Sequence, residues 1–523
     1  MHLPSPVLRS ATKILPALIL LLWLGTAGGQ QTINNSALIP KVAPDSEVRM
    51  EGMSPDWVKT LIMAEFRIET ATPEGTFAAA ATRVLDHYAE MGVNGLWIDP
   101  IYERGSKGNG YGNYGPLTIE PLLTGAKTTE DSFRAVKQFV DEAHRRNIRV
   151  FFDIIVWGTR KEAPLVTEHP EFYRKIDGKL WEVWGGYGFD WSNAGLRKWY
   201  KEATVRFVER TGADGFRVDL APDTSGYFFK EIRDALYAEG RKIAIISEIP
   251  NKREYTFDLE QVGVTGWTEE TDWAHPEHLK EQKAKFPMHN EYLFKANIVD
   301  AIRTGAGIGK ATLQQEGEGG MFRFYTSNLL DHDDARPFVT GNRVRFGYSS
   351  ILAPFIPMWW IGEEWNNPNV QTGRERGCVY FTTIDWSEMD VPANRAFYED
   401  AKRYIRIRRS LPGIFEQFPA STREANIAKV ESRKDGAANN LQAYARFGGG
   451  KAVLVVPNYG GEARGQFEVT PDLGSMGLNA GSSHRIVDLM TGEALPVTVG
   501  GGKRSFTVAI EGECLGVFLV ERQ

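Results

Sequence analysis

The chain contains only two cysteines in 523 residues, and it carries no excess of basic charge. Cys378 and Cys514 cannot build the disulfide framework of a small secreted domain. We expect two free thiols, although the sequence leaves open whether these two residues pair. Because 61 Lys and Arg face 67 Asp and Glu, the formal net charge is −6. A protein that binds duplex nucleic acid usually shows a basic footprint, so no nucleic-acid partner is expected.

Sequence motifs for zinc and for nucleotides are also missing. There is no His-Glu-x-x-His motif and no Cys/His cluster, so a zinc site has no support. Residues 110–115 match a dinucleotide fingerprint as a string, but Pro116 and a β-like stretch follow instead of a helix. Residues 305–310 resemble a phosphate loop, yet Ala311 stands where that loop needs Ser or Thr. We therefore expect no nucleotide cofactor.

Long hydrophobic runs are absent outside the N-terminus. There, basic residues precede an apolar run over 14–24, and Gly25 and Ala27 supply small residues just before a cleavage point. This pattern predicts a signal peptide over 1–28 and a secreted or periplasmic protein, and the run is too short to span a bilayer comfortably. An uncleaved anchor is the alternative. No later stretch approaches the roughly 18 apolar residues of a membrane span, so no membrane partner is expected after cleavage.

Between residues 51 and 415, short apolar runs alternate with segments of helical period. The runs that we expect to be strands are 61–66, 95–100, 149–156, 215–220, 243–248, 322–329 and 354–361. Strand then helix, repeated, indicates parallel strands joined by helical crossovers. Seven such strands fit an α/β fold of the (β/α)8 barrel type, and we expect the missing sixth strand near residues 262–267. Residues 29–50 are polar and contain proline, which is typical of a linker or arm.

Two segments depart from this alternation. Residues 157–190 are too long for a simple loop and lack helical period, so they predict a small excursion after the third strand. Four of its aromatic residues either form a wall on which sugar rings stack or fill a small core; they are Trp157, Trp181, Trp184 and Tyr187. Over residues 420–523, seven short alternating runs with glycine turns predict a separate antiparallel β-sandwich.

Charged residues stand at the ends of three predicted strands. Arg217 and Asp219 close the fourth strand, and a period of two places their side chains on the same face. An arginine beside a carboxylate favours its ionised form. Glu248 closes the fifth strand, and Asp333 follows the seventh. Three carboxylates at the C-terminal face of a barrel suit glycoside cleavage, in which one attacks, one exchanges a proton and one stabilises the sugar cation.

With these residues, the sequence resembles the α-amylase family, glycoside hydrolase family 13, from about residue 55 to the C-terminus. The matching segments are GVNGLWIDP at 92–100, GFRVD at 215–219, IPMWWIGEE at 356–364 and DLMTGE at 488–493. Asp153 stands where the first family motif has its Asp. The resemblance implies a (β/α)8 barrel over 51–415, a domain B-like insertion over 157–190 and a domain C-like sandwich over 420–523.

The resemblance also implies roles for individual residues. Asp219 takes the place of the nucleophile, Glu248 that of the general acid/base, and Asp333 that of the carboxylate that steadies the transition state. Tyr111 falls in the segment that supplies a tyrosine to stack on the sugar at the cleavage point. The other residues expected to contact a carbohydrate substrate are Arg217, His332 and Trp157.

The first motif departs from the family pattern. It normally ends in Asn-His, and Trp157 and Gly158 stand in those places. The lost His would have hydrogen-bonded the sugar, and the lost Asn commonly serves a calcium site. No metal or other cofactor is therefore expected, although calcium stays open. Asp331 likewise replaces the usual Asn of the fourth motif.

Together these features predict a secreted retaining α-glycosidase that acts on α-glucans or oligosaccharides through a covalent glycosyl-enzyme on Asp219. One alternative is a transglycosylase or isomerase that uses the same site but presents an acceptor other than water. Another is a catalytically silent carbohydrate-binding protein, against which the intact carboxylates argue. The sequence does not decide between hydrolysis and transfer, or between endo and exo action.

Overall fold

The computed structural model describes residues 55–523 with several gaps. The described ranges are 55–104, 108–115, 117–219, 226–249, 254–257, 324–328, 332, 342–352, 356–367, 381–415, 427–439, 442–459, 463–479, 481–500 and 503–523. The predicted signal peptide and the linker or arm lie outside these residues. Within the described part, no helix is both long and apolar enough to cross a membrane. Cys514 is a buried free thiol, whereas Cys378 is outside the described residues.

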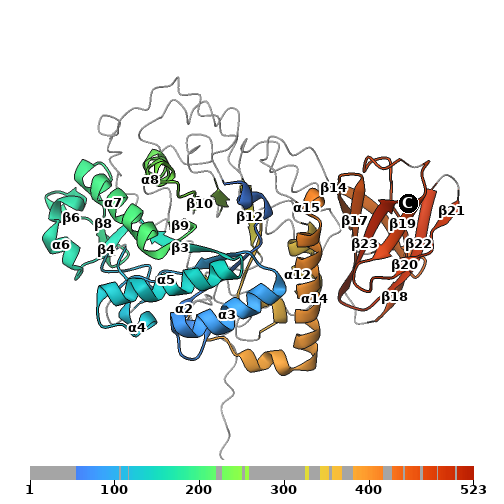
Figure 1. The fold of residues 1–523 in the computed structure, drawn as a ribbon, viewed down its shortest axis with the longest axis horizontal. Helices are drawn as coiled ribbons and strands as arrows, with labels where there is room; N and C mark the ends of the chain where they lie inside the picture. The colour runs from blue at the N-terminus through green and yellow to red at the C-terminus, as the bar shows by residue number, and fades with distance from the viewer. Residues whose placement is uncertain are drawn as a thin grey trace, which may run out of the picture.

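Eight strands close into a barrel, with a layer of helices outside it (Figure 1). In chain order they are β1 (Met63–Phe66), β2 (Gly95–Ile98), β3 (Arg149–Ile155), β9 (Gly215–Asp219), β10 (Ala244–Ile249), β11 (Glu254–Phe257), β12 (Phe324–Asn328) and β13 (Ile356–Trp360). Chain neighbours pair throughout, and β13 closes the ring on β1. The barrel is confirmed, and seven of its strands overlap the apolar runs expected from the sequence.

The sixth barrel strand differs from the expectation of an all-parallel barrel. It is β11, which pairs antiparallel with both β10 and β12. The chain leaves only residues 250–253 between β10 and β11. Four residues can form a hairpin but not the crossover of a dozen or more residues that a parallel pair requires. The segment 262–267, where the sixth strand was expected, lies outside the described residues.

The helices of the described residues fall into two groups by length. The longer ones are α3 (Phe77–Met91), α5 (Thr129–Arg145), α7 (Ala194–Thr211), α8 (Gly226–Ala238) and α14 (Pro392–Ser410), and the shorter ones are α2 (Ile68–Ala71), α4 (Pro121–Thr124), α6 (Pro164–Glu168), α12 (Asn342–Gly347) and α15 (Pro412–Phe415). At the start of α5, the Thr128 hydroxyl accepts a hydrogen bond from the Asp131 N–H and so caps the helix.

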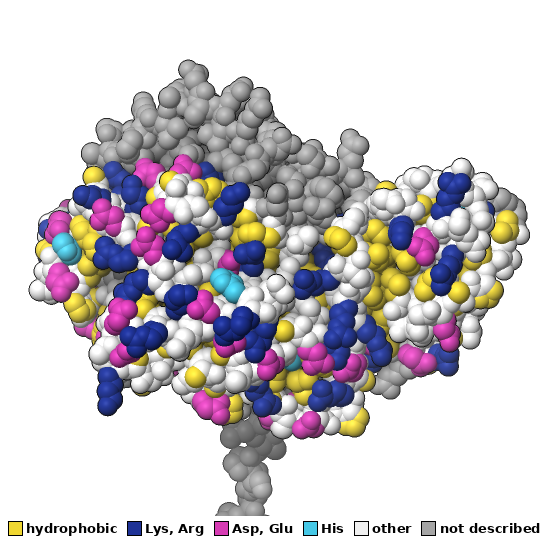
Figure 2. Space-filling model, in the orientation of Figure 1, with side chains coloured by type: hydrophobic (Ala, Val, Ile, Leu, Met, Phe, Trp, Pro, Cys, Tyr) yellow, Lys and Arg dark blue, Asp and Glu magenta, His cyan; other side chains and the backbone are white. Residues whose placement is uncertain are grey.

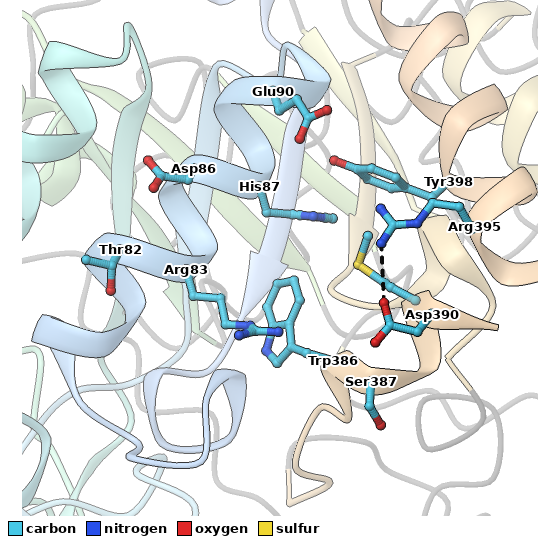
Figure 3. A pocket seen from close by; sticks show the side chains of 11 residues that line it. Thr82, Arg83, Asp86, His87, Glu90, Trp386, Ser387, Asp390, Arg395 and Tyr398 are labelled. Carbon is cyan, nitrogen blue, oxygen red and sulfur yellow. Dashed lines mark ion pairs between the residues drawn. The ribbon is translucent and has the colours of Figure 1, made fainter. Parts of the chain in front are cut away.

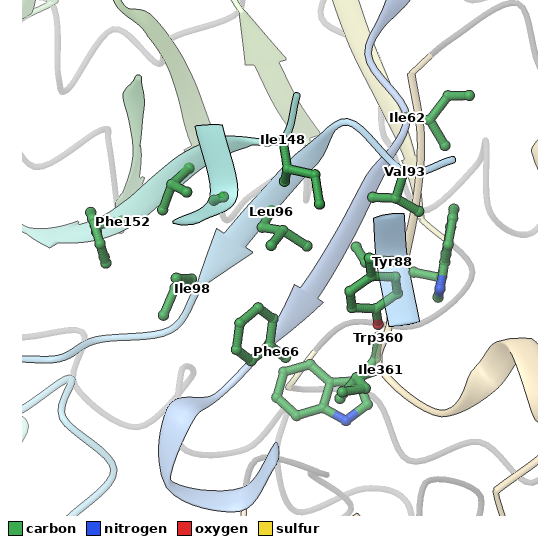
Figure 4. Packing of buried hydrophobic residues seen from close by; sticks show 14 of the residues in the cluster. Ile62, Phe66, Tyr88, Val93, Leu96, Ile98, Ile148, Phe152, Trp360 and Ile361 are labelled. Carbon is green, nitrogen blue, oxygen red and sulfur yellow. The ribbon is translucent and has the colours of Figure 1, made fainter. Parts of the chain in front are cut away.

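Side chains of the barrel strands alternate between two hydrophobic cores. Outward residues such as Phe66, Leu96 and Phe152 pack with Tyr88 of α3 under the helical layer (Figure 4). Inward residues form a second cluster that fills the barrel; it includes Met63, Trp97, Phe151, Ile246 and Met358. Successive side chains in a strand point to opposite faces, so the residue two positions after an inward-facing residue also points into the barrel. In these strands, that residue lies nearer the carboxyl end. This alternation positions the candidate site.

The excursion after β3 contains short strands in two small sheets, together with α6 and the 3-10 helix η2 (Pro170–Phe172). The strands are β4 (Gly158–Arg160), β5 (Lys175–Ile176), β6 (Lys179–Leu180), β7 (Glu182–Val183) and β8 (Gly186–Gly188). One sheet has the order β4-β8-β7, and β5 pairs with β6 in the other. A small excursion at this place was expected from its length and its lack of helical period.

The C-terminal strands form an antiparallel sheet of ten strands. They are β14 (Ile427–Lys434), β15 (Ala437–Ala438), β16 (Ala443–Gly448), β17 (Lys451–Asn458), β18 (Gly465–Thr470), β19 (His484–Asp488), β20 (Ala494–Leu495), β21 (Thr498–Gly500), β22 (Lys503–Ile510) and β23 (Cys514–Arg522). The first half of β14 pairs with β16 and its second half with β18, so one strand joins two halves of the sheet. Val430, Leu454, Phe467 and Phe518 share one core from both halves, as a sandwich requires.

Candidate active site

Several charged side chains point into the barrel at the carboxyl ends of its strands. Six of them are almost fully buried; they are Glu65, Asp99, Asp153, Arg217, Asp219 and His332. Glu65, Asp99 and Asp153 each follow an inward-facing apolar residue by two positions, as Asp153 follows Phe151 in β3. Asp219 is the most exposed of the six, at 7%, which places it nearest the open end of the cluster.

Arg217 holds two carboxylates together at the centre of this cluster. Its Nη1 donates to Asp153 Oδ1 at 2.8 Å and to Asp219 Oδ1 at 2.9 Å. The side chain of Arg217 has no exposed surface, so both ion pairs are shielded from water. The prediction that Arg217 and Asp219 share one strand face is confirmed. A guanidinium at this distance favours the anionic form of Asp219.

Asp153 is the anchor on which Arg217 and Tyr111 depend. Its Oδ2 accepts hydrogen bonds from the Tyr111 hydroxyl at 2.9 Å and from Trp97 Nε1 at 3.0 Å. Burial raises the pKa of Asp153 to about 6, and the guanidinium of Arg217 opposes this rise. Burial also raises the pKa of Tyr111 well above its ordinary value, so the phenol stays protonated and can donate. These bonds fix the Tyr111 ring beside Arg217.

His332 stacks on Tyr111 and contacts two further carboxylates. The two rings lie 5.1 Å apart between centroids and are inclined by 21°. His332 Nδ1 is 2.6 Å from Glu65 Oε1 and 3.9 Å from Asp99 Oδ1. A carboxylate at Nδ1 fixes the orientation of an imidazole.

Glu65, Asp99 and His332 also have side chains of the kinds that bind metal ions, and their ligand atoms lie within 4.8 Å of one another. Among the described residues, they form the one group of at least three such side chains. In the structure the close contact between the Glu65 carboxylate and the His332 ring is a hydrogen bond. Glu65 and Asp99 were not expected from the sequence. Counting two residues on from the inward-facing Met63 and Trp97 would have found both of them.

Two predicted catalytic residues are not described at the level of their side chains. Glu248 lies in β10, where the preceding Ser247 pairs with Val218, so its backbone is next in register to Asp219. Asp333 is outside the described residues, directly after His332. The structure thus brings Arg217, Asp219, Tyr111 and His332 together, and it places Glu248 on the neighbouring strand.

Trp157 stands where the family motif has the Asn that commonly serves calcium. Calcium takes oxygen ligands, and the indole of Trp157 offers only an N–H, which it donates to the Tyr111 carbonyl oxygen at 2.9 Å. This residue therefore does not fit a calcium site at that place. The ring is 95% buried, since only 5% of its surface is exposed.

A surface hollow of about 490 Å³ lies elsewhere, in the outer layer of helices. Arg83 and His87 of α3, Trp386 of the 3-10 helix η7 (Trp386–Asp390) and Tyr398 of α14 line it (Figure 3). The guanidinium of Arg83 covers the Trp386 ring at 4.8 Å. None of the six cluster residues lines this hollow. We assign it no part in the chemistry.

The distribution of charge on the surface agrees with the nearly equal numbers of acidic and basic residues in the sequence. On the face shown in Figure 2, basic and acidic side chains are interspersed over the described part of the surface. The buried cluster differs from this balance, because four carboxyl groups face one arginine and one histidine among its described residues. A surplus of negative charge in a water-excluded site stabilises a positive charge that develops on a bound molecule.

Comparison with known proteins shows relatives among α-amylase-family enzymes. The chain is 22% identical over 479 residues to the α-amylase MalA of Haloarcula japonica, covering 84% of this chain and 59% of that protein. It is 24% identical over 378 residues to a cyclomaltodextrinase of a Bacillus species, covering 66% and 61%. A match at 23% over 433 residues to neopullulanase 2 of Thermoactinomyces vulgaris covers 75% and 63%. No protein-family model matches the chain.

The chain spans between 59% and 63% of the length of these three relatives. Solved structures show the same fold. A maltogenic α-amylase from Thermotoga neapolitana superposes with a TM-score of 0.63 at 18% identity, covering 88% of this chain and 99% of that one. An α-amylase from Anoxybacillus gives 0.64 at 13% identity, covering 89% and 98%.

Proposed function

We propose, since its relatives are α-amylase-family glycoside hydrolases, that this chain is a retaining α-glycosidase acting on α-glucosidic bonds. The observation that carries the proposal is the buried ion-pair network in which Arg217 joins Asp153 to Asp219 at the carboxyl end of the barrel. Asp219 offers a carboxylate oxygen as the nucleophile. It is the most exposed residue of a cluster in which carboxyl groups outnumber cationic groups. Such a site suits an oxocarbenium-like transition state.

In the proposed first step, an Asp219 oxygen forms a bond to the anomeric carbon while the bond to the leaving sugar oxygen breaks. Glu248 gives its proton to that oxygen. In the second step, Glu248 takes a proton from water, the water oxygen bonds to the anomeric carbon, and Asp219 leaves. Two inversions retain the α configuration. Arg217 keeps Asp219 anionic, and its own position depends on Asp153.

The remaining residues are proposed to bind the sugar during these steps. Asp333 and His332 would hold its hydroxyl groups, and the Tyr111 ring would pack on its apolar face. Glu65 orients the His332 ring by the contact at Nδ1. A transglycosylase or isomerase would use the same first step and differ only in the acceptor.

Incubation of the mature protein with maltooligosaccharides, starch, pullulan, trehalose and sucrose tests the proposal. We expect cleavage or transfer of at least one α-glucoside, with an α-configured first product in a time-resolved proton NMR spectrum. A distance of about 5–5.5 Å between the carboxyl groups of Asp219 and Glu248 supports retention, whereas a distance of about 6.5–9.5 Å supports inversion. A β-configured first product, or sugar binding without any turnover, would contradict the assignment and favour inversion or a silent binding protein, respectively.

We also propose that the protein is exported. The basic start, the short apolar run over 14–24 and the small residues Gly25 and Ala27 predict removal of a signal peptide at about residues 27–30. Mass spectrometry of the exported protein should show an N-terminus in this range. Exported material that still begins at Met1 would contradict the prediction.

A further inference from the structure

Among the described residues, four hairpins turn through two-residue loops in which both residues have a positive φ. The loops and their φ angles are Asp177–Gly178 (50° and 76°), Asp435–Gly436 (51° and 82°), Gly449–Gly450 (58° and 75°) and Trp184–Gly185 (45° and 80°). Each is closed by a pair of strand residues, such as Val183 and Gly186 around the last loop. Positive φ at both positions is the requirement of a type I′ turn, which favours Asn-Gly, Asp-Gly and Gly-Gly.

Trp184 does not fit this sequence preference of type I′ turns. Three of the four loops use Asp or Gly at the first position, and the fourth places the largest side chain of all there. A bulky residue at positive φ is a conformational outlier that persists only when something else favours it. Its own hairpin does not provide the reason by burial, because 61% of Trp184 is exposed. The chain therefore retains a strained and exposed tryptophan.

The position of Trp184 connects it to the candidate active site. Its ring meets Trp157 edge to face, with 5.5 Å between ring centroids and an angle of 88°. Trp157 donates its Nε1–H to the carbonyl oxygen of Tyr111, whose hydroxyl is bonded to Asp153. Trp184 is thus the exposed end of a chain of aromatic contacts that begins at the catalytic cluster.

The hairpin that carries Trp184 is firmly held against Trp157. A Cβ at Gly186 would lie 2.8 Å from Trp157 Cη2 and 2.1 Å from the Thr159 carbonyl oxygen, so the glycine allows a close approach of the strand. β8 also pairs with β4, directly after Trp157. An aromatic ring on such a base loses little conformational entropy when a ligand packs on it.

We propose that Trp184 is a stacking platform for a sugar ring of the α-glucan chain, beyond the sugar that is cleaved. The apolar face of a pyranose packs well on an indole plane. Of the four aromatic residues considered as a sugar-stacking wall, the exposed Trp184 then contacts the ligand and the buried Trp157 supports it. This inference rests on the proposed function, because it assumes that the bound molecule is a chain of glucose units.

Replacing Trp184 by Asn tests the platform, because Asn suits the first position of the turn. We expect the melting temperature of Trp184→Asn to equal or exceed that of the wild type. KM for maltohexaose should rise roughly 2- to 12-fold, the value of one aromatic stacking contact, while kcat stays within about 2-fold. KM for maltose should not change. Trp184→Phe, which keeps an aromatic ring, should retain most of the maltohexaose affinity.

The matched control is Ile176→Ala, which removes another exposed apolar side chain, 46% exposed, from the neighbouring hairpin. It should leave KM for both sugars unchanged. If Trp184→Asn unfolds at lower temperature, or if KM for maltohexaose stays constant in an active enzyme, the platform is refuted. Calorimetric titration of maltohexaose into Asp219→Asn, with and without Trp184→Asn, separates the two proposals. Equal binding by these two proteins refutes the platform, and absence of turnover in the wild type refutes only the enzymatic function.

Discussion

Asp219→Asn is expected to lower kcat on any α-glucoside by at least about 10⁴-fold, the scale found when one member of a catalytic unit is removed. The amide has nearly the same shape but cannot attack the anomeric carbon as an anion. Its oxygen can still accept the hydrogen bond from Arg217 Nη1, which is 2.9 Å long in the structure. The fold should therefore persist, and circular dichroism together with the melting temperature should show this.

The matched control for Asp219→Asn is Asp214→Asn, in front of the opposite end of β9. Asp214 accepts hydrogen bonds from Arg149 at 2.7 Å and from the Val150 N–H at 2.9 Å, and its Oδ2 lies 2.7 Å from His144 Nε2. Its replacement should cost about 1–3 kcal/mol of stability and leave kcat unchanged. Near-normal turnover by Asp219→Asn, or a large loss of kcat in Asp214→Asn, would contradict the assignment of the nucleophile.

Arg217→Met should have the largest effect on stability. It leaves Asp153 and Asp219 without the cation that both contact, and breaking a buried pair in this way costs about 3–5 kcal/mol of the free energy of unfolding. The rate should fall as well, because the ion pair that favours the anionic form of Asp219 is lost. Adding Asp153→Asn to Arg217→Met should recover part of the stability but none of the rate. Urea unfolding and single-turnover kinetics measure the two effects.

The stability loss of Arg217→Met should also depend on pH. The pKa of Asp153 is raised to about 6 in the folded protein, above its ordinary 3.8, so the folded state binds this proton more tightly than the unfolded state. Stability therefore falls as pH rises from about 4 to about 6. Without Arg217, which opposes the rise, this window should extend to higher pH. The stability deficit should be smaller at pH 5 than at pH 8, and an equal deficit at both would contradict the account.

The sequence predicts the barrel from the alternation of apolar runs with helical segments, and it predicts part of the candidate site from the period of two within a strand. That period places Arg217 and Asp219 on one strand face, and in the structure Arg217 contacts both Asp219 and Asp153. It could also have revealed Glu65 and Asp99, which follow inward-facing apolar residues. They were missed because a single carboxylate after a strand has no distinguishing pattern until the barrel brings it to His332.

Other features depend on geometry that the sequence does not display. The reversal of β11 follows from a four-residue connection, which becomes visible only once the ends of β10 and β11 are known. The aromatic residues of the excursion look alike in the sequence, yet Trp157 is buried and Trp184 is exposed. The difference arises from the turn at Trp184–Gly185, whose positive φ angles no pattern of Trp residues would predict.

The central claim is that Asp219 forms a covalent bond to the sugar. The most direct measurement is mass spectrometry of peptides from the wild-type protein after reaction with 5-fluoro-α-D-glucosyl fluoride, which slows release of a glycosyl-enzyme. The account predicts a glycosyl adduct on the peptide that contains Asp219, and its loss in Asp219→Asn. An adduct on a different carboxylate, or turnover of the reagent to a β-configured product without any adduct, would contradict it.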